Sequence, residues 1–156
     1  MTGRVVCLSG FKGAGKDWIK VKMFPDSTRL ALADYLKEDV SRMYEIPLKY
    51  FHDVELKDKF HEGLLMTPRQ KLIEHATEMR KKDVHFFVDK IIKQIDDQHD
   101  YVITDARFFS EIWRMSKLFG KRMTLLWVKR EGCERGDDSI ELTEADCDAT
   151  IYNKIE

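Results

Sequence analysis

The feature that most constrains this chain is a glycine-rich stretch near its N-terminus, Gly10-Phe11-Lys12-Gly13-Ala14-Gly15-Lys16-Asp17. It follows residues 4–9, a β-branched apolar run typical of a buried strand, and precedes helix-forming residues. A strand, a G-x-x-x-x-G-K loop and a helix form the setting that a phosphate-binding loop requires. Glycines let backbone N–H groups turn inward around phosphate oxygens, and the helix N-terminus adds partial positive charge. The sequence therefore predicts a nucleoside triphosphate site, with Lys16 reaching the β- and γ-phosphates.

The position after the lysine departs from the commonest form of this loop, which has Ser or Thr there to bind Mg²⁺. In this chain the residue is Asp17. A carboxylate is also a hard oxygen ligand and can hold Mg²⁺ directly or through water. An acidic residue at a helix N-terminus has a purely structural use as well, because it complements the helix dipole. Both interpretations of Asp17 stay open.

Length and charge narrow the class of protein. The chain has 156 residues, with 43% hydrophobic and 35% charged residues, which is typical of one globular domain over residues 1–156. Its 27 basic and 28 acidic residues leave a net charge of −1, so we expect no nucleic-acid partner. Dimers are the commonest assembly among soluble oligomers, so a homodimer is the expected assembly if one forms.

The N-terminus and the cysteines indicate a compartment. The longest apolar runs are far shorter than a membrane span, and the first residues lack a signal-peptide pattern, so no membrane contact is expected. Three scattered cysteines, Cys7, Cys133 and Cys147, fit neither a disulfide framework nor a zinc spacing. The expected location is the cytoplasm.

The rest of the chain alternates between strand and helix patterns. Further strands are expected over residues 28–33, 100–105, 122–128 and 149–152, with helices between them. Strands separated by helices imply an α/β fold with a mostly parallel sheet of about five strands, covered by helices on both faces. In such a sheet the ligand groove lies at the carboxyl ends of the strands. Four groups follow these strand ends: loop 10–17, Asp34, Asp105 with Arg107, and Lys129 with Arg130.

Two helices in the middle of the chain begin at recognisable caps. Asp34 is expected to be the N-cap of a helix through Tyr44, and a role in binding is the alternative. Thr67 with Gln70 forms a capping box for a second helix. Arg69 and Arg80 share a face of that helix but lie about 16 Å apart along its axis, so an unbroken helix would make it hard for both to bind one phosphate.

Five motifs occur in order along the chain and together resemble a known family. They are Gly10-x-Lys12-x-x-Gly15-Lys16-Asp17, Leu32-Ala33-Asp34-x-Leu36-Lys37, Thr67-Pro68-Arg69-Gln70, Thr77-Glu78, and Ile103-Thr104-Asp105-x-Arg107-Phe108-x-x-Glu111. The chain resembles the deoxynucleoside monophosphate kinases of tailed phages and large DNA viruses, within the P-loop nucleoside monophosphate kinase superfamily. The resemblance covers about residues 5 to 130. It implies a P-loop NTPase-type three-layer α/β/α fold and, for a viral protein, a place in the host cytoplasm.

The resemblance also implies an activity, the transfer of the γ-phosphate of ATP to a deoxynucleoside monophosphate with Mg²⁺ as cofactor. An acceptor-binding helical portion is expected over about residues 34–97 and a lid over about residues 130–142. Phosphoryl transfer needs positioning and cationic charge rather than covalent chemistry. No general base is needed, because a monophosphate is already largely dianionic at pH 7.

Each residue type in these motifs suits one part of that reaction. Guanidinium groups can pair two phosphate oxygens at once, and carboxylates suit Mg²⁺. The expected donor-binding residues are Gly10, Lys12, Gly13, Ala14, Gly15, Lys16, Asp17 and Arg130, with Arg135 as a second arginine of the lid. The expected acceptor-binding residues are Asp34, Lys37, Arg69, Arg80 and Arg107. The expected catalytic residues are Lys16, Arg107 and Asp105, with Asp17 and Asp105 as metal ligands.

Two other functions stay open at this point. Animal-type phosphomevalonate kinases are similar around the loop, and they keep the reaction class but change the acceptor. A nucleotide-binding module that transfers no phosphate, such as a switch or an assembly subunit, is the alternative from another class.

Overall fold

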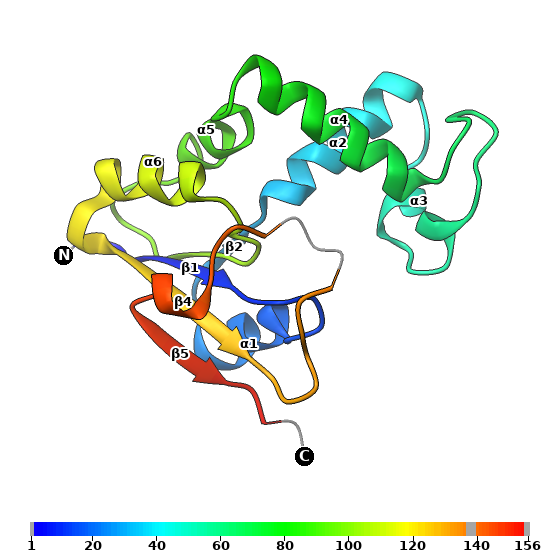
Figure 1. Ribbon diagram of the computed structural model, residues 1–156. Helices are drawn as coiled ribbons and strands as arrows, with labels where there is room; N and C mark the ends of the chain where they lie inside the picture. The colour runs from blue at the N-terminus through cyan, green and yellow to red at the C-terminus, as the bar shows by residue number, and fades with distance from the viewer. Residues whose placement is uncertain (1, 137–139, 155–156) are drawn as a thin grey trace. The chain divides into compact units, whose positions relative to one another are not determined.

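The computed structural model describes residues 2–136 and 140–154. The strands are β1 (Val5–Ser9), β2 (Thr28–Leu30), β3 (Tyr101–Ile103), β4 (Met123–Lys129) and β5 (Ala149–Tyr152). The α-helices are α1 (Lys16–Met23), α2 (Leu32–Tyr44), α3 (Lys49–His52), α4 (Pro68–Lys82), α5 (Phe86–Ile92) and α6 (Phe109–Phe119) (Figure 1). Short 3-10 turns are η1 (Leu56–Asp58), η2 (Gly120–Arg122) and η3 (Glu144–Asp146).

The five strands form one parallel sheet in the order β2-β3-β1-β4-β5. β1 is the central strand, and all five of its residues are buried, as its unbroken apolar run predicts. Because every pair is parallel, the carboxyl ends of all five strands meet at one edge of the sheet. This edge holds the loop after β1, so the predicted P-loop NTPase-type α/β fold is confirmed.

Helices cover both faces of the sheet. On one face, Ile19 of α1 packs in a buried cluster with residues of β1, β3 and β4 that include Leu8 and Val128. Successive strand residues point to opposite faces, so Cys7 and Ile103 point the other way, and both are fully buried. On that second face α6 contacts β4, and Met115 of α6 is fully buried. The core of the sheet is therefore closed on both sides.

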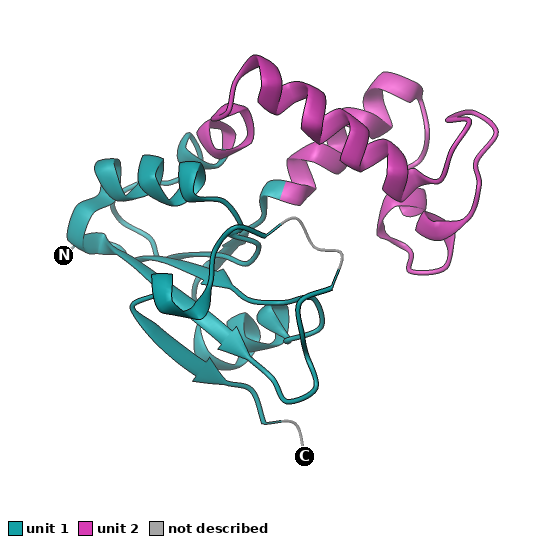
Figure 2. Cartoon of the chain, viewed as in Figure 1, with its two compact units in different colours: residues 1–32, 91–156 teal, residues 33–90 magenta. Residues whose placement is uncertain are grey.

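The chain divides into two compact units (Figure 2). Unit 1 contains residues 1–32 and 91–156, with the whole sheet, and unit 2 contains residues 33–90. The expected acceptor-binding portion over 34–97 overlaps unit 2 in residue numbers, and its role stays a prediction. Within the described part of the chain, none of the helices has the length and apolar character needed to cross a membrane.

Unit 2 has its own small apolar core. Val40, Ile46, Phe51 and Leu64 form a buried cluster with Leu72 and other partly buried residues packed around it. The predicted capping box of α4 is confirmed, since the Thr67 side chain accepts from the Gln70 N–H and the Gln70 side chain accepts from the Thr67 N–H.

The buried side of α4 differs in part from the side that its helical pattern predicts. Helical periodicity turns Leu72, Ile73, Ala76 and Met79 inward, but Ile73 is 58% exposed, and the buried residues of α4 are Pro68, Lys71 and His75. The Lys71 ammonium lies 4.4 Å from the centre of the Tyr44 ring and 3.1 Å from Glu74 Oε1. A long lysine side chain buries its carbon stem along an aromatic ring while its charge stays paired.

The same periodicity predicts that Val84 points inward, but Val84 is half exposed.

The predicted role of Asp34 as an N-cap is also wrong. The second strand ends at Leu30 instead of residue 33, and α2 begins at Leu32, so Asp34 lies in the first turn of that helix. The first N–H of α2, that of Leu32, donates to Asp105 Oδ1 at 2.9 Å. The helix is capped by a residue 73 positions away in sequence, which local patterns do not reveal.

Gly10 is required where β1 enters the loop. Its φ of 146° lies in a region that side chains avoid, and an added Cβ would overlap the backbone carbonyl oxygen of Val128. We expect Gly10→Ala to lower the free energy of unfolding by about 2–4 kcal/mol, because the strain and the overlap cannot both relax. Thermal unfolding followed by circular dichroism measures this. Gly136→Ala is the control, since an added Cβ there meets nothing within 4 Å. Equal melting temperatures for the two variants would contradict the prediction.

Candidate functional site

The loop between β1 and α1 has the conformation expected of a phosphate-binding loop. Gly13 and Gly15 have φ values of 84° and 86°, in the left-handed region that favours glycine. The loop leads directly into α1, an eight-residue helix that begins at Lys16. Within residues 2–136 and 140–154, the N–H groups of Gly13 and Gly15 have no hydrogen-bond acceptor. Unpaired amides at the positive end of a helix form an anion site.

Lys16 folds back over this loop. Its Nζ donates to the carbonyl oxygens of Gly10 at 2.8 Å and Phe11 at 3.3 Å. The ammonium group is therefore held at the loop itself, at the start of α1 and next to the left-handed Gly15. This is where a lysine must lie to contact phosphates that the loop amides bind.

Two residues from distant segments donate hydrogen bonds to the carbonyl groups of Gly13 and Ala14 in the loop. Arg130, one residue after β4, donates from Nη1 to the Gly13 carbonyl at 3.3 Å. Asn153, one residue after β5, donates from Nδ2 to the Ala14 carbonyl at 2.8 Å. Arg130 was predicted to bind the donor, and here it contacts the loop predicted to bind that donor. These two hydrogen bonds fix the directions of the Gly13 and Ala14 carbonyl groups.

Asp17 makes an ion pair across to the edge of the sheet. Its Oδ1 accepts from Arg29 Nε of β2 at 2.7 Å, and both side chains are substantially exposed. An exposed pair of this kind contributes about 0–1 kcal/mol to stability. The pairing does not decide between the structural and the metal-binding interpretation of Asp17.

The segment after β3 is tied to the end of β1. The Ala106 N–H donates to the Leu8 carbonyl at 3.1 Å, and Ser9 Oγ donates to the Ala106 carbonyl at 2.7 Å. These bonds place Asp105 and Arg107, on either side of Ala106, beside the strand that leads into the loop. The sheet therefore brings both predicted catalytic residues to the edge that also holds the loop.

Arg107 is exposed, and its backbone binds another part of the chain. Its carbonyl accepts from the N–H groups of Glu141 and Leu142 at 2.9 and 3.2 Å. The last two residues of the predicted lid over residues 130–142 are therefore bonded to the backbone of Arg107. Ser139 and the rest of residues 137–139 in that predicted lid lie outside the described residues. Arg135, the other lid arginine, donates to the Ile140 carbonyl at 3.0 Å instead of to the loop.

The carboxylates predicted to bind metal are of the type that suits a magnesium ion. Asp17 follows Lys16 directly, and Asp105 follows β3, the neighbour of β1 in the sheet. In the described part of the chain, no three His, Cys, Asp or Glu side chains gather as in an all-protein metal site. A Mg²⁺ ion bound with a nucleotide takes one or two carboxylates and completes its shell with phosphates and water, so two carboxylates fit this ion.

The other predicted residues belong to unit 2. Arg69 forms an ion pair with Asp58, and Lys37 Nζ lies 3.5 Å from His52 Nδ1. Arg69 lies in the first turn and Arg80 in the last turn of α4, which is unbroken. The helix is unbroken, so their spacing makes it hard for both guanidinium groups to hold the same phosphate. The acceptor role of these residues and of Asp34 stays a prediction.

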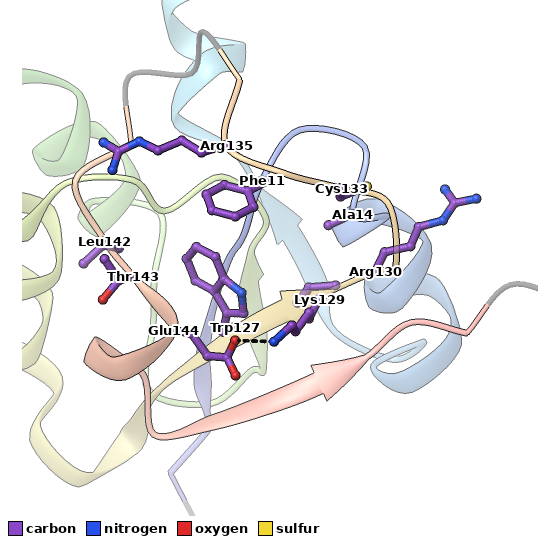
Figure 3. Close-up of a pocket in the computed structure, with 11 residues that line it drawn as sticks. Phe11, Ala14, Trp127, Lys129, Arg130, Cys133, Arg135, Leu142, Thr143 and Glu144 are labelled. Carbon is purple, nitrogen blue, oxygen red and sulfur yellow. Dashed lines mark hydrogen bonds and ion pairs between the residues drawn. The ribbon is translucent and has the colours of Figure 1, made fainter.

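A cavity of about 190 Å³ lies beside the loop in unit 1. Figure 3 shows the rings of Phe11 and Trp127 next to each other in its wall, and their centres lie 5.2 Å apart in an edge-to-face arrangement. Leu142, Cys133 and Arg135 also line this cavity, whereas Lys16 and Arg107 do not. The cavity combines apolar rings with cationic side chains.

Three residues of this site were not assigned a role from the sequence. In the sequence, Phe11 occupies a variable position of the loop pattern, and Trp127 lies in an apolar run that predicts a strand. Asn153 follows the last strand directly, and in a parallel sheet the residues after strand ends face the ligand groove, so this position is the signal that points to it.

Comparisons with known proteins give solved structures of low similarity to this chain. Neither the protein-family models nor the curated protein sequences give a match. The structure of the APS kinase CysC Cys556Ala mutant from Mycobacterium tuberculosis is 12% identical over 97% of this chain and 86% of its own, with a TM-score of 0.44. The crystal structure of TT1252 from Thermus thermophilus is 13% identical over 99% of this chain and 90% of its own, with a TM-score of 0.48. The fold assignment rests on the strand order and the loop.

The three thiols differ in their surroundings, which predicts their reactivity. Burial raises the pKa of Cys7 far above its ordinary value, and it raises the pKa of Cys147 to about 11. Cys133 is half-buried, and its Sγ would lie 3.6 Å from a Cβ added to Gly13. We expect iodoacetamide to modify native Cys133 first, then Cys147, and to leave Cys7 intact.

Inorganic triphosphate should slow modification of Cys133 several-fold, because an anion on the loop amides would crowd this thiol. Mass spectrometry of the labelled protein measures all three rates. Cys147 is the internal control, since triphosphate should leave its rate unchanged. Rapid labelling of Cys7, or equal slowing of Cys133 and Cys147, would contradict this prediction.

Proposed function

We propose that this chain is a small nucleotide kinase that transfers the γ-phosphate of ATP to a deoxynucleoside monophosphate and gives the diphosphate. The observation that carries the proposal is the loop after β1, with the unpaired N–H groups of Gly13 and Gly15 and with Lys16 folded over it. Such amides bind the oxygens of a polyphosphate, and the ammonium group neutralises charge that builds up during transfer.

The cavity beside the loop also supports a nucleotide as the donor. Its rings, Phe11 and Trp127, offer apolar surface next to the site proposed for the phosphates. Nucleotide sites generally combine an apolar pocket for the base with a few charged groups for the phosphates.

Each catalytic step has a residue to perform it. The loop amides and Lys16 would bind the β- and γ-phosphates and hold the γ-phosphorus in line with the acceptor. Arg107, on the same edge of the sheet, would bind the acceptor phosphate through two of its donors. Asp17 and Asp105 would hold Mg²⁺, which when bound neutralises phosphate charge. The acceptor phosphate needs no base, because it is already ionised at neutral pH.

The identity of the acceptor rests on the sequence motifs. Asp105-x-Arg107-Phe108 and Thr67-Pro68-Arg69-Gln70 are the motifs shared with the deoxynucleoside monophosphate kinases. We assign the acceptor phosphate to Arg107 first, and Arg69 and Arg80 remain the other candidates from these motifs and their helix. Phosphomevalonate is the alternative acceptor for the same reaction class.

A coupled assay of ADP formation over a panel of deoxynucleoside monophosphates tests this proposal. We expect turnover that needs both Mg²⁺ and an added monophosphate. Lys16→Ala should lower kcat by about 10²–10³-fold, since it removes a preorganised positive charge from the transferring phosphate. Lys22→Ala is the matched control, because Lys22 is an exposed lysine of the same helix whose ammonium lies over Trp18.

The possible outcomes separate the candidate functions. Turnover with phosphomevalonate alone would replace the acceptor and keep the reaction class. Tight ATP binding without turnover for any acceptor would favour a module that binds nucleotide but transfers no phosphate. Equal activity of the Lys16→Ala and Lys22→Ala variants would overturn the proposed role of the loop.

A further inference from the structure

Asn153 joins the last strand of the sheet to the phosphate-binding loop. Its backbone N–H donates to the Lys129 carbonyl at 2.7 Å, which continues the pairing of β5 with β4. Its side-chain Nδ2 donates to the Ala14 carbonyl at 2.8 Å, across 139 residues of sequence. Only 4% of the residue is exposed, so water does not compete for this bond. Asn153 is therefore fixed by a hydrogen bond from its backbone and by another from its side chain.

The loop is built closely around this amide. A Cβ added to Gly15 would overlap Asn153 Nδ2, so the contact depends on glycine at this position. Ala14 is 1% exposed and lies in the same buried layer. Two consecutive residues of the loop therefore pack directly against one side chain from the opposite end of the chain.

The hydrogen bond from Asn153 to the Ala14 carbonyl also fixes the direction of the Gly15 N–H, because both groups belong to one peptide unit. A peptide unit is planar and trans, so its C=O and its N–H point in opposite directions. When Asn153 holds the Ala14 carbonyl, the Gly15 N–H must point away from Asn153. That N–H is one of the loop amides with no acceptor in the described part of the chain.

Stability alone does not account for an amide at this position. Asn153 Oδ1 is buried and has no hydrogen-bond donor among the described residues. A buried acceptor without a partner costs folding free energy that an apolar side chain of similar size would avoid. The Asn153 side chain therefore lowers the stability of the fold through its unpaired Oδ1, while its Nδ2 orients the loop.

We infer that Asn153 is a positioning residue that aims the Gly15 N–H at the triphosphate of the donor. The inference rests on the proposed function, because it assigns a purpose to the amide geometry of that same site. Asn153 acts through the Ala14–Gly15 peptide and touches neither phosphate nor acceptor.

The test replaces Asn153 with leucine, which keeps the approximate volume and removes the donor. We expect Asn153→Leu to weaken binding of ATP and of inorganic triphosphate about 10–100-fold by isothermal titration calorimetry. Removing a hydrogen-bond partner that orients a metal ligand costs about 10–100-fold in metal affinity, and we expect the same range for a partner that orients a phosphate-binding N–H. The KM for ATP should rise by a similar factor, while the KM for the acceptor monophosphate should not change. Asn153→Ala repeats the test if the leucine variant does not fold.

Two controls separate positioning from general damage. Tyr152→Phe changes the preceding residue, which is 63% exposed, and should leave all binding constants unchanged. A residue with only a structural role would lower the melting temperature and the active fraction but would leave both KM values of the folded enzyme unchanged. Wild-type binding of triphosphate with equal binding by Asn153→Leu would overturn this inference alone. A wild-type protein that binds neither ATP nor triphosphate would overturn the proposed function, and this inference with it.

Discussion

The structure depends on the direction of a few peptide units in one loop. Hydrogen bonds from Lys16, Arg130 and Asn153 hold the carbonyl groups of the loop. Because peptide units are planar, holding the carbonyls also fixes the opposite N–H groups, among them that of Gly15. A free glycine-rich loop would lose this order to conformational entropy. The donors that prevent this loss come from the start of α1 and from the residues that follow β4 and β5, so the order of the loop depends on segments far apart in sequence.

The parallel sheet makes this arrangement possible. All five strands run in the same direction, so each delivers its following residues to one edge. Asp105 shows how closely that edge is connected, because it caps the first turn of α2 and lies one residue before Ala106, which binds the end of β1. β1 and β3 are buried throughout, and this close packing supports the edge, as preorganised catalysis requires.

Local sequence patterns predicted the strands, the loop and the capped helix α4, because these depend on alternation, glycine and capping residues close together in sequence. The features that these patterns predicted wrongly, such as the cap of α2, depend on contacts between residues far apart in sequence. Asp34 has the residue type and position of a local cap, whereas the residue that accepts from the first N–H of α2, Asp105, lies 73 positions away. The buried Lys71 lies along a tyrosine ring, and hydrophobic periodicity does not reveal a buried lysine. Asn153 has no predicted role, although it follows a strand end, because its contact with the loop joins residues 139 positions apart in sequence.

The central claim is that the loop amides bind the phosphates of a nucleoside triphosphate. The most direct measurement is a titration of ¹⁵N-labelled protein with MgATP, followed by the backbone amide resonances. The account predicts that Gly13, Gly15 and Lys16 show the largest shifts, and that AMP at equal concentration leaves them almost unchanged. Absence of shifts in these three amides at saturating ATP, or equal shifts with AMP, would contradict it.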